Sequence, residues 1–327
     1  MLFIGGTRFV GRAMAQAALD AGHQVTVLHR GQTTANDLGD AEHLLADRDQ
    51  DLSVLADREY DATIDVCAYL PRQVESLARA LGERGGHHVY ISTMSVYADT
   101  DQPGLDEDAP LIELADPTVD TVTNDTYGGL KVLCERAAVA AYGEENVTIV
   151  RPTYVIGPHD YTFRFPWWVQ RIAAGGEVLA PGPRRSPMQI VDARDQGAWT
   201  VGLAEAGTPG AFNGISTGLP FGFEDMLNAI VGAVGPEGTR LSWVDGLWLA
   251  GKGVTGANLP LWNEGQDEWT LAGSNGRALA TGMSPRPLRD SIVDTLAWIR
   301  SSGAEPAAAA GLAATREAEL LDEWRAN

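Results

Sequence analysis

Cysteine, positive charge and long apolar runs are all scarce in this chain of 327 residues. Only two cysteines occur, Cys67 and Cys134. They lie in apolar segments without metal or redox spacing, so we expect buried thiols rather than a disulfide. Lys and Arg number 24 against 44 Asp and Glu, which gives a formal net charge of −20. Such a surface repels phosphate backbones, so we expect no nucleic-acid partner.

The sequence also lacks the signals of membrane insertion and export. No apolar run approaches the length of a membrane span, so no membrane partner is expected. No charged leader precedes an apolar stretch, and a strand expected at residues 2–4 leaves no room for a targeting peptide. We expect a cytoplasmic protein, a monomer or a homodimer, that acts on a small-molecule substrate.

Strand and helix patterns alternate through the first half of the chain. Expected strands cover residues 2–4, 24–28, 43–45, 62–66, 88–91 and 148–150, and helical periodicity covers 9–20, 50–56, 72–81 and 127–142. This alternation predicts an α/β fold, a Rossmann-type doubly wound parallel sheet with helices on both faces. Ligands bind such sheets at the carboxyl ends of the strands.

The second half is less regular, because Gly and Pro clusters break it into short pieces. We expect residues 1–156 together with about 189–217 to form the dinucleotide-binding domain. Residues from about 157–188 and 218–302 are expected to form a smaller, irregular C-terminal substrate domain. An Ala-rich stretch predicts a linker from 303 to 314, and a charged helix is expected from 315 to 325.

A glycine-rich turn follows the first expected strand. Glycine lets the backbone turn tightly and lets a pyrophosphate approach closely, while the next helix offers unpaired N–H groups to that anion. A plain tight turn is the alternative interpretation. The nucleotide interpretation predicts a site formed by Gly5, Thr7, Arg8, Phe9, Val10 and Gly11.

Tyr127 and Lys131 stand four residues apart, on one face of an expected helix. An ammonium near the phenol, together with the charge of an oxidised nicotinamide, would lower the tyrosine pKa from about 10. Such a tyrosine can exchange a proton with an alcohol or carbonyl as a hydride moves. A surface Tyr–Lys pair is the alternative. An upstream strand end, Ser92-Thr93-Met94-Ser95, supplies hydroxyls that could hold a substrate oxygen or only make local backbone bonds.

Together these motifs resemble the short-chain dehydrogenase/reductase superfamily, in its extended or atypical branch of NAD-dependent epimerases, dehydratases and reductases. The glycine turn, the hydroxyl-rich strand end, Tyr-Gly-Gly-Leu-Lys and Arg-Pro-Thr-Tyr-Val-Ile-Gly-Pro follow the order and spacing of that branch, from residue 1 to about 300. The resemblance implies that Tyr127 is the catalytic acid/base and that Lys131 binds the nicotinamide ribose and tunes Tyr127. It further implies that Thr93 holds the reacting oxygen, with Ser92 and Ser95 as rivals.

Two departures from the family pattern bear on the cofactor. Arg8 replaces the middle glycine, and its guanidinium can fork onto phosphate. This variant turn resembles an atypical subgroup, some of whose members bind RNA in plastids. After the second strand, Leu28-His29-Arg30 offers no carboxylate to a ribose 2′-OH, so NADP is expected over NAD. His29 could instead accept a bond from the 2′-OH, and Arg30 could simply open a polar loop.

The remaining site residues follow from the resemblance. Asp47 and Arg48 match the adenine-binding position of the family, or only cap a loop. The substrate pocket is expected from residues 154–168 and 184–189, and its expected contacts are Ser95, Tyr154, Arg164 and Arg185.

The two arginines would suit an anionic group, such as the diphosphate of a nucleotide sugar. No metal site is expected, because His159-Asp160 has no other ligands nearby in the sequence. The sequence therefore predicts an NAD(P)-dependent oxidoreductase, a carbonyl reductase or a nucleotide-sugar epimerase or dehydratase. The dehydratase is disfavoured, because Met94-Ser95 stands where dehydratases of this branch carry an acidic pair. A non-catalytic NADP-binding sensor and an RNA-binding relative remain as alternatives.

Overall fold

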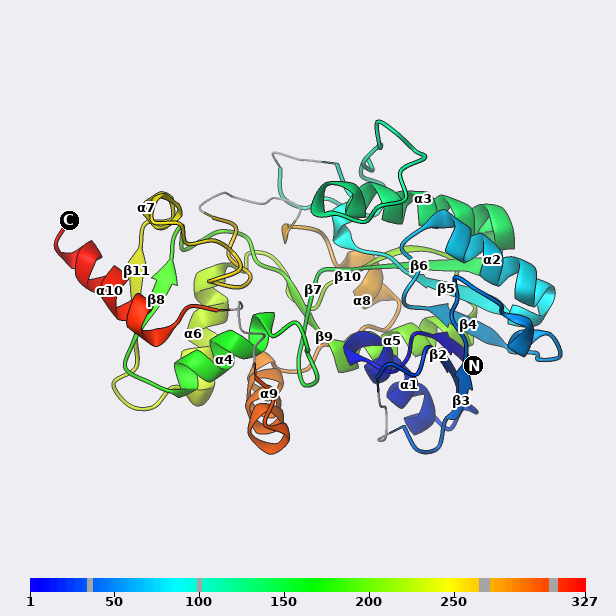
Figure 1. Ribbon diagram of the computed structural model, residues 1–327, viewed down its shortest axis with the longest axis horizontal. Coiled ribbons are helices and arrows are strands. Elements are labelled where there is room, and N and C mark those ends of the chain that lie inside the picture. The colour runs from blue at the N-terminus through cyan, green and yellow to red at the C-terminus, as the bar shows by residue number, and fades with distance from the viewer. Residues whose placement is uncertain (34–37, 99–101, 265–270, 306–310) are drawn as a thin grey trace.

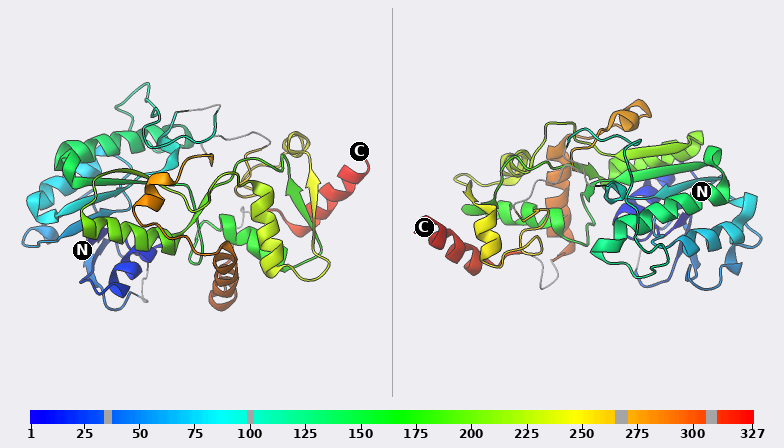
Figure 2. Two further views of the ribbon diagram at one scale, coloured as in Figure 1. Left: turned by 180° about the vertical axis from the view of Figure 1, so that it is seen from behind. Right: turned by 90° about the horizontal axis from the view of Figure 1, so that it is seen from above.

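The computed structural model describes residues 1–33, 38–98, 102–264, 271–305 and 311–327. The elements form two lobes, one around the N-terminal half of the chain and one that includes the C-terminus (Figure 1). Figure 2 shows the same two lobes from behind and from above.

Seven parallel strands form the main sheet, in the order β10-β6-β5-β4-β1-β2-β3. Their bounds are β1 Leu2–Ile4, β2 Thr26–His29, β3 Glu42–Leu45, β4 Ala62–Asp65, β5 His87–Ile91, β6 Val147–Pro152 and β10 Gly210–Gly214. All the carboxyl ends therefore lie at one edge, and the order reverses between β1 and β4, where doubly wound sheets bind ligands. The expected Rossmann-type fold is confirmed.

Helices cover both faces of this sheet (Figure 1). On one face, α1 (Phe9–Asp20) packs against α5 (Ala193–Ala206). On the other face, α2 (Pro71–Leu81) packs against α3 (Asn124–Tyr142). In β1, Leu2 and Ile4 pack on the α2 side while Phe3 packs on the α1 side. Because both faces of the strand are buried, its sequence is continuously apolar rather than alternating.

The second lobe is built on a separate pair of parallel strands, β8 (Glu177–Pro181) and β11 (Arg240–Val244). Helices α4 (Arg164–Ala173), α6 (Phe223–Val234) and α9 (Leu288–Ser302) pack on one another beside it. Trp168 lies in their core, edge-on to Phe223 at a ring distance of 5.5 Å. The short helix α7 (Gly246–Gly251) follows β11.

Between the lobes, β7 (Tyr154–Ile156) pairs with β9 (Ile190–Asp192), and α8 (Gly276–Ala280) contacts β10 (Figure 1). The C-terminal helix α10 (Ala314–Arg325) is fastened to the second lobe through Glu317. This buried carboxylate accepts bonds from Arg171 Nε at 2.7 Å and from the Leu179 N–H at 2.9 Å.

The structure corrects one expected helix. Residues 50–56 hold only a 3₁₀ turn, Ser53–Leu55, because Asp51 accepts bonds from the N–H and hydroxyl of Ser53 and so stabilises a local turn. The charged helix expected from 315 to 325 is confirmed as α10. The linker expected from 303 to 314 lies partly outside the described residues. No helix in the described part of the chain is long and apolar enough to cross a membrane.

Candidate functional site

A cavity of about 630 Å³ opens at the carboxyl ends of the central strands. Its walls are the glycine turn, the residues that follow β2 to β5, one face of α3 and the start of the second lobe. Every residue expected to bind the cofactor or to act catalytically lines it: Gly5, Thr7, Arg8, Phe9, Val10, Gly11, Arg30, Asp47, Arg48, Thr93, Tyr127 and Lys131. Three of the four expected substrate contacts line it too: Ser95, Tyr154 and Arg164.

Two positions of the glycine turn, Gly5 and Gly11, have no room for a side chain. A Cβ atom on Gly5 would lie 2.8 Å from Cys67 Sγ, and one on Gly11 would lie 2.2 Å from the Gly5 carbonyl oxygen. Helix α1 starts after Arg8 without a side-chain cap and without an acidic residue in its first turn. Its first N–H groups are thus available to an anion, and the residues present fit the pyrophosphate of a dinucleotide.

Arg8 occupies the position of the family's middle glycine, and its side chain lies outside the turn. The side chain leaves the turn and stacks on Tyr161 of the second lobe, with Cζ 3.5 Å from the ring centroid. Both residues line the cavity. The stack uses the face of the guanidinium, and its N–H edge stays available to phosphate.

Tyr127 lies in the first turns of α3, which Thr123 caps by accepting a bond from the Thr126 N–H at 3.3 Å. The Thr93 side chain lies near the Tyr127 phenol and favours its ionised form, which lowers the pKa of Tyr127 against the effect of burial. The N–H of Ser95 donates to Thr93 Oγ1, at 3.2 Å. Of Ser92, Thr93 and Ser95, Thr93 is the one whose side chain acts on the pKa of the Tyr127 phenol. Ser92 Oγ lines the same cavity, buried and without a partner among the described residues.

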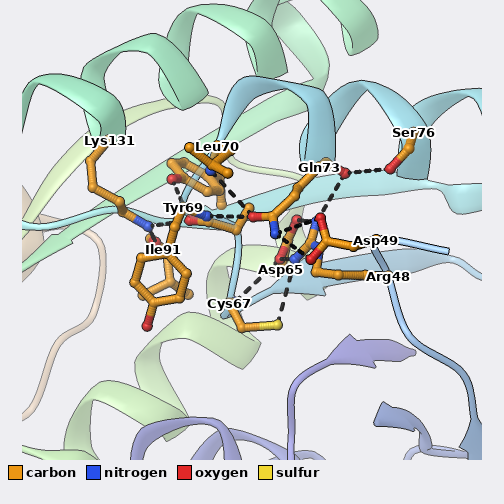
Figure 3. A network of polar contacts seen from close by, with 12 residues as sticks. Arg48, Asp49, Asp65, Cys67, Tyr69, Leu70, Gln73, Ser76, Ile91 and Lys131 are labelled. Carbon is orange, nitrogen blue, oxygen red and sulfur yellow. Dashed lines mark hydrogen bonds and ion pairs between the residues drawn. The ribbon is translucent and has the colours of Figure 1, made fainter. Parts of the chain in front are cut away.

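Lys131, one turn after Tyr127 on α3, directs its ammonium to the segment after β4 and to the end of β5 (Figure 3). Its ammonium donates to the carbonyl oxygens of Ala68 at 2.9 Å and Ile91 at 2.6 Å, and burial lowers its pKa to about 8. Burial raises the pKa of Tyr127, while Thr93 and the charge of Arg164 act in the opposite direction. Lys131 is not among the groups that shift the pKa of Tyr127 in the protein alone, and its expected effect together with an oxidised nicotinamide stays a prediction.

A buried ion pair fixes the strand ends under the cavity (Figure 3). Arg48 donates to both carboxylate oxygens of Asp65, at 2.6 and 2.8 Å, and to the Gln73 carbonyl at 3.0 Å. Burial disfavours the Asp65 carboxylate, but Arg48 outweighs that effect and holds its pKa below the usual value. Because the terminal nitrogens of Arg48 are engaged in the interior, Asp47 is the better placed of the two residues for an adenine contact.

The sequence interpretation missed this ion pair. An aspartate inside the buried apolar strand β4 was the available signal, since buried carboxylates almost always have a partner. Cys67 was expected to be buried, but it is only half-buried and lines the cavity next to Gly5. Cys134 is buried, and both thiols are free.

A second buried pair holds α3, the helix that carries Tyr127 and Lys131. Glu135, one turn after Lys131, accepts two bonds from Arg151 of β6, at 3.0 and 2.7 Å. Arg151 also donates to the Tyr97 hydroxyl at 2.9 Å. The rotation of α3 about its axis, and with it the direction of the Tyr127 and Lys131 side chains, is thus tied to the sheet.

His29, at the end of β2, uses both ring nitrogens within the protein. Its Nδ1 accepts the Gly31 N–H at 3.1 Å, so its Nε2 carries the proton and donates to His43 Nδ1 at 3.0 Å. The alternative in which His29 accepts a bond from a ribose 2′-OH is therefore wrong. Arg30 lines the cavity next to it.

The expected contribution of residues 184–189 is also wrong, since none of them lines the cavity. The backbone holds this segment in the second lobe, where the Ser186 carbonyl accepts the Phe223 N–H at 3.0 Å. Arg184 lies 5.1 Å from the Trp243 ring centroid, and Arg185 is exposed outside the cavity. Tyr161, Thr162 and Leu271 supply the wall instead. The described residues include no cluster of side chains that could hold a metal ion.

Comparisons with known proteins identify a family, a curated relative and structures of the same fold. The chloroplast stem-loop binding protein of 41 kDa b from Arabidopsis thaliana is 27% identical over 212 residues. That match covers 60% of this chain and 52% of the relative, so it spans about half of that protein.

Solved structures share the fold over 92% of this chain. A putative epimerase from Burkholderia cenocepacia J2315 has a TM-score of 0.70 at 20% identity and is covered over 97% of its length. The Bordetella bronchiseptica enzyme WbmH, solved with NAD+, has a TM-score of 0.69 at 16% identity, and a UDP-glucose 4-epimerase has 0.68 at 17%. Each of the two is covered over 98% of its length.

The family model described as "NAD dependent epimerase/dehydratase family" matches residues 1–213, which is more than half of the chain. Its match includes the glycine turn, Thr93 and the Tyr127–Lys131 pair. The chain belongs to the NAD dependent epimerase/dehydratase family.

Proposed function

We propose that the protein is an NAD(P)-dependent oxidoreductase of the extended short-chain dehydrogenase type, with Tyr127 as its proton donor and acceptor. The observation that carries the proposal is the convergence of Tyr127, Thr93 and Lys131 with a glycine turn on one cavity. The membership of the family supports a bound nicotinamide dinucleotide.

A bound nicotinamide dinucleotide would supply the hydride donor or acceptor. The residues of the chain then have separate roles. Tyr127 gives a proton to the substrate oxygen or takes one from it, and Thr93 hydrogen-bonds the same oxygen as its charge develops. Lys131 has three donors, of which two hold Ala68 and Ile91, so the third can bind a ribose hydroxyl.

The protonation state of Tyr127 favours one direction of reaction. Because burial raises its pKa, the phenol is the resting form at neutral pH. A phenol can donate directly to a carbonyl oxygen, whereas alcohol oxidation needs the phenolate. The protein without nucleotide is therefore set to give a proton to a carbonyl oxygen, and oxidation of an alcohol first requires loss of the phenol proton.

The test is Tyr127→Phe. Turnover should fall by about 10²–10⁴-fold, the usual contribution of a general acid or base, while nucleotide affinity stays unchanged. Tyr142→Phe is the matched control, because Tyr142 lies on the same helix with a buried hydroxyl that has no partner in the described chain. Activity of Tyr127→Phe within a few-fold of the wild type would contradict the proposal.

We further propose that NADP is the preferred cofactor. Arg30 lines the cavity after β2, the described residues 30–33 directly after that strand include no carboxylate, and both ring nitrogens of His29 are occupied. Arg30→Gln should weaken NADP by about tenfold, as expected for loss of a charged hydrogen bond, and leave NAD affinity unchanged. Equal wild-type affinity for the two nucleotides would contradict the preference.

The Arabidopsis relative is described as a stem-loop binding protein, which makes RNA binding a second candidate. The formal charge of −20 argues against it. Filter binding of a labelled RNA stem-loop at low salt separates the two candidates. A submicromolar affinity that falls steeply with salt would favour RNA.

A further inference from the structure

The cavity and its charges also limit the kind of substrate that the site can take. We propose that the substrate is a compact ketone or secondary alcohol that carries one carboxylate or phosphate group, held by Arg164, and that it is not a nucleotide sugar. The inference rests on the proposed function, since it takes Tyr127 as the proton-transfer group.

Size is the first argument. The 630 Å³ cavity extends from Asp47, under the expected adenine position, to Arg164 in the second lobe, so cofactor and substrate share it. Pockets of roughly 300–1,000 Å³ bury one drug-sized ligand, and a dinucleotide is at least that large. The volume left beside a bound dinucleotide is therefore small, and it suits a molecule of a few carbon atoms better than a second nucleotide.

Charge is the second argument. Of the described lining residues from Pro152 onward, Arg164 is the only charged one. The two other arginines expected to help are elsewhere: Arg184 pairs with Glu224 at 3.5 Å, and Arg185 lies outside the cavity. One guanidinium can bind one anionic group of the substrate. A diphosphate has two adjacent phosphate groups, and binding both would need further hydrogen-bond donors.

The setting of Arg164 indicates how it binds that group. Its Nε donates to Thr162 Oγ1 at 3.2 Å, and its Cζ lies 5.2 Å from the Tyr154 ring centroid, so two neighbours fix the guanidinium plane. The described chain supplies no hydrogen-bond partner for its terminal nitrogens. This free edge matches the two oxygens of a carboxylate or phosphate.

Arg164 also lies near the chemistry. It shares the cavity with Tyr127, and its positive charge favours the phenolate of that residue. A substrate anion on Arg164 therefore lies within electrostatic range of the reacting oxygen. The anion and the reacting C–O group belong to one short molecule. The Arg8–Tyr161 stack, which joins the two lobes across the same cavity, further restricts long ligands.

The experiment is calorimetric titration of the protein saturated with NADP+, with three probes in turn. Oxamate is a small carboxylate with an unreactive carbonyl, and inorganic phosphate and UDP-glucose are the other two. We expect saturable binding of oxamate or phosphate and none of UDP-glucose. Arg164→Gln should weaken the anion by about 10–100-fold, Arg164→Lys by less, and neither should change nucleotide affinity.

Arg289→Gln is the control, since Arg289 is an exposed arginine of α9 that does not line the cavity. Saturable binding of UDP-glucose, absence of binding by both small anions, or an unchanged anion affinity in Arg164→Gln would each overturn the inference. Failure of the proposed function is distinguishable, because it shows as absent nucleotide binding before any probe is added, or as an active Tyr127→Phe variant.

Discussion

Three glycines in two packed helices provide a graded test of how the glycine turn is built. Gly11 lies in α1, and Gly197 and Gly202 lie in α5. An added Cβ would be 2.2 Å from the Gly5 carbonyl oxygen at Gly11 and 2.8 Å from the Ala13 carbonyl oxygen at Gly197. At Gly202, which is exposed, it would meet nothing within 4 Å.

The magnitudes follow from two opposing effects. Replacing a helical glycine by alanine gains about 0.5–1 kcal/mol, so Gly202→Ala should stabilise the protein by that amount. Overpacking costs about 1–3 kcal/mol, so Gly197→Ala and Gly11→Ala should have a net loss of about 0–2.5 kcal/mol. The contacts at both positions are with backbone, and the loss should be larger at Gly11 because its contact is shorter.

Nucleotide affinity separates the two destabilised variants. Gly11→Ala pushes the start of α1 away from the end of β1 and should weaken the nucleotide by tenfold or more, since pyrophosphate binding needs that close approach. Gly197→Ala disturbs the α1–α5 contact away from the cavity and should leave the affinity unchanged. The assay is urea unfolding together with nucleotide titration. Wild-type nucleotide affinity in Gly11→Ala would refute the reasoning.

Two further predictions concern buried charge. The ammonium of Lys131 has a pKa of about 8 in the folded protein and about 10.4 in the unfolded chain. Between these two pH values the unfolded chain binds more protons than the folded protein, so the contribution of Lys131 to the free energy of unfolding rises with pH. From pH 7.5 to 9.5, the unfolding free energy of the wild type should gain about 2 kcal/mol relative to Lys131→Met, and a constant difference would contradict this. Glu135→Gln leaves Arg151 buried without its counter-ion and should lower the unfolding free energy in urea by about 3–5 kcal/mol, while Glu135→Leu combined with Arg151→Met should recover most of it. A double variant as unstable as the single one would contradict that.

The parts of the fold that were predictable from the sequence depend on local signals. β1 and α1 match their expected ranges, because an apolar strand, a glycine turn and an apolar helix follow one another directly. Helix α3 begins three residues earlier than expected, at Asn124, because Thr123 and Thr126 form a capping box ahead of the apolar pattern. The helix expected from 50 to 56 failed because an aspartate side chain stabilises a turn there.

The predictions about side chains at the site that were wrong or missed have a different cause. Residues that follow sheet strands were placed at the cavity correctly, since parallel topology brings all strand ends to one edge. What a side chain does there depends on distant partners. Arg48 turns to Asp65 and Lys131 turns to the carbonyls of Ala68 and Ile91, which no local pattern could show. Arg185 was misplaced because its position depends on how the second lobe packs.

The fastening of α10 has a consequence for the order of events on the ribosome. The last strand of the main sheet, β10, ends at Gly214, so all the strands of that sheet have been synthesised about a hundred residues before Glu317. The second lobe lacks the acceptor for the Leu179 N–H until Glu317 has been synthesised. Since N-terminal units generally fold first during translation, we expect a nascent chain that can hold nucleotide while its substrate wall is still unfinished.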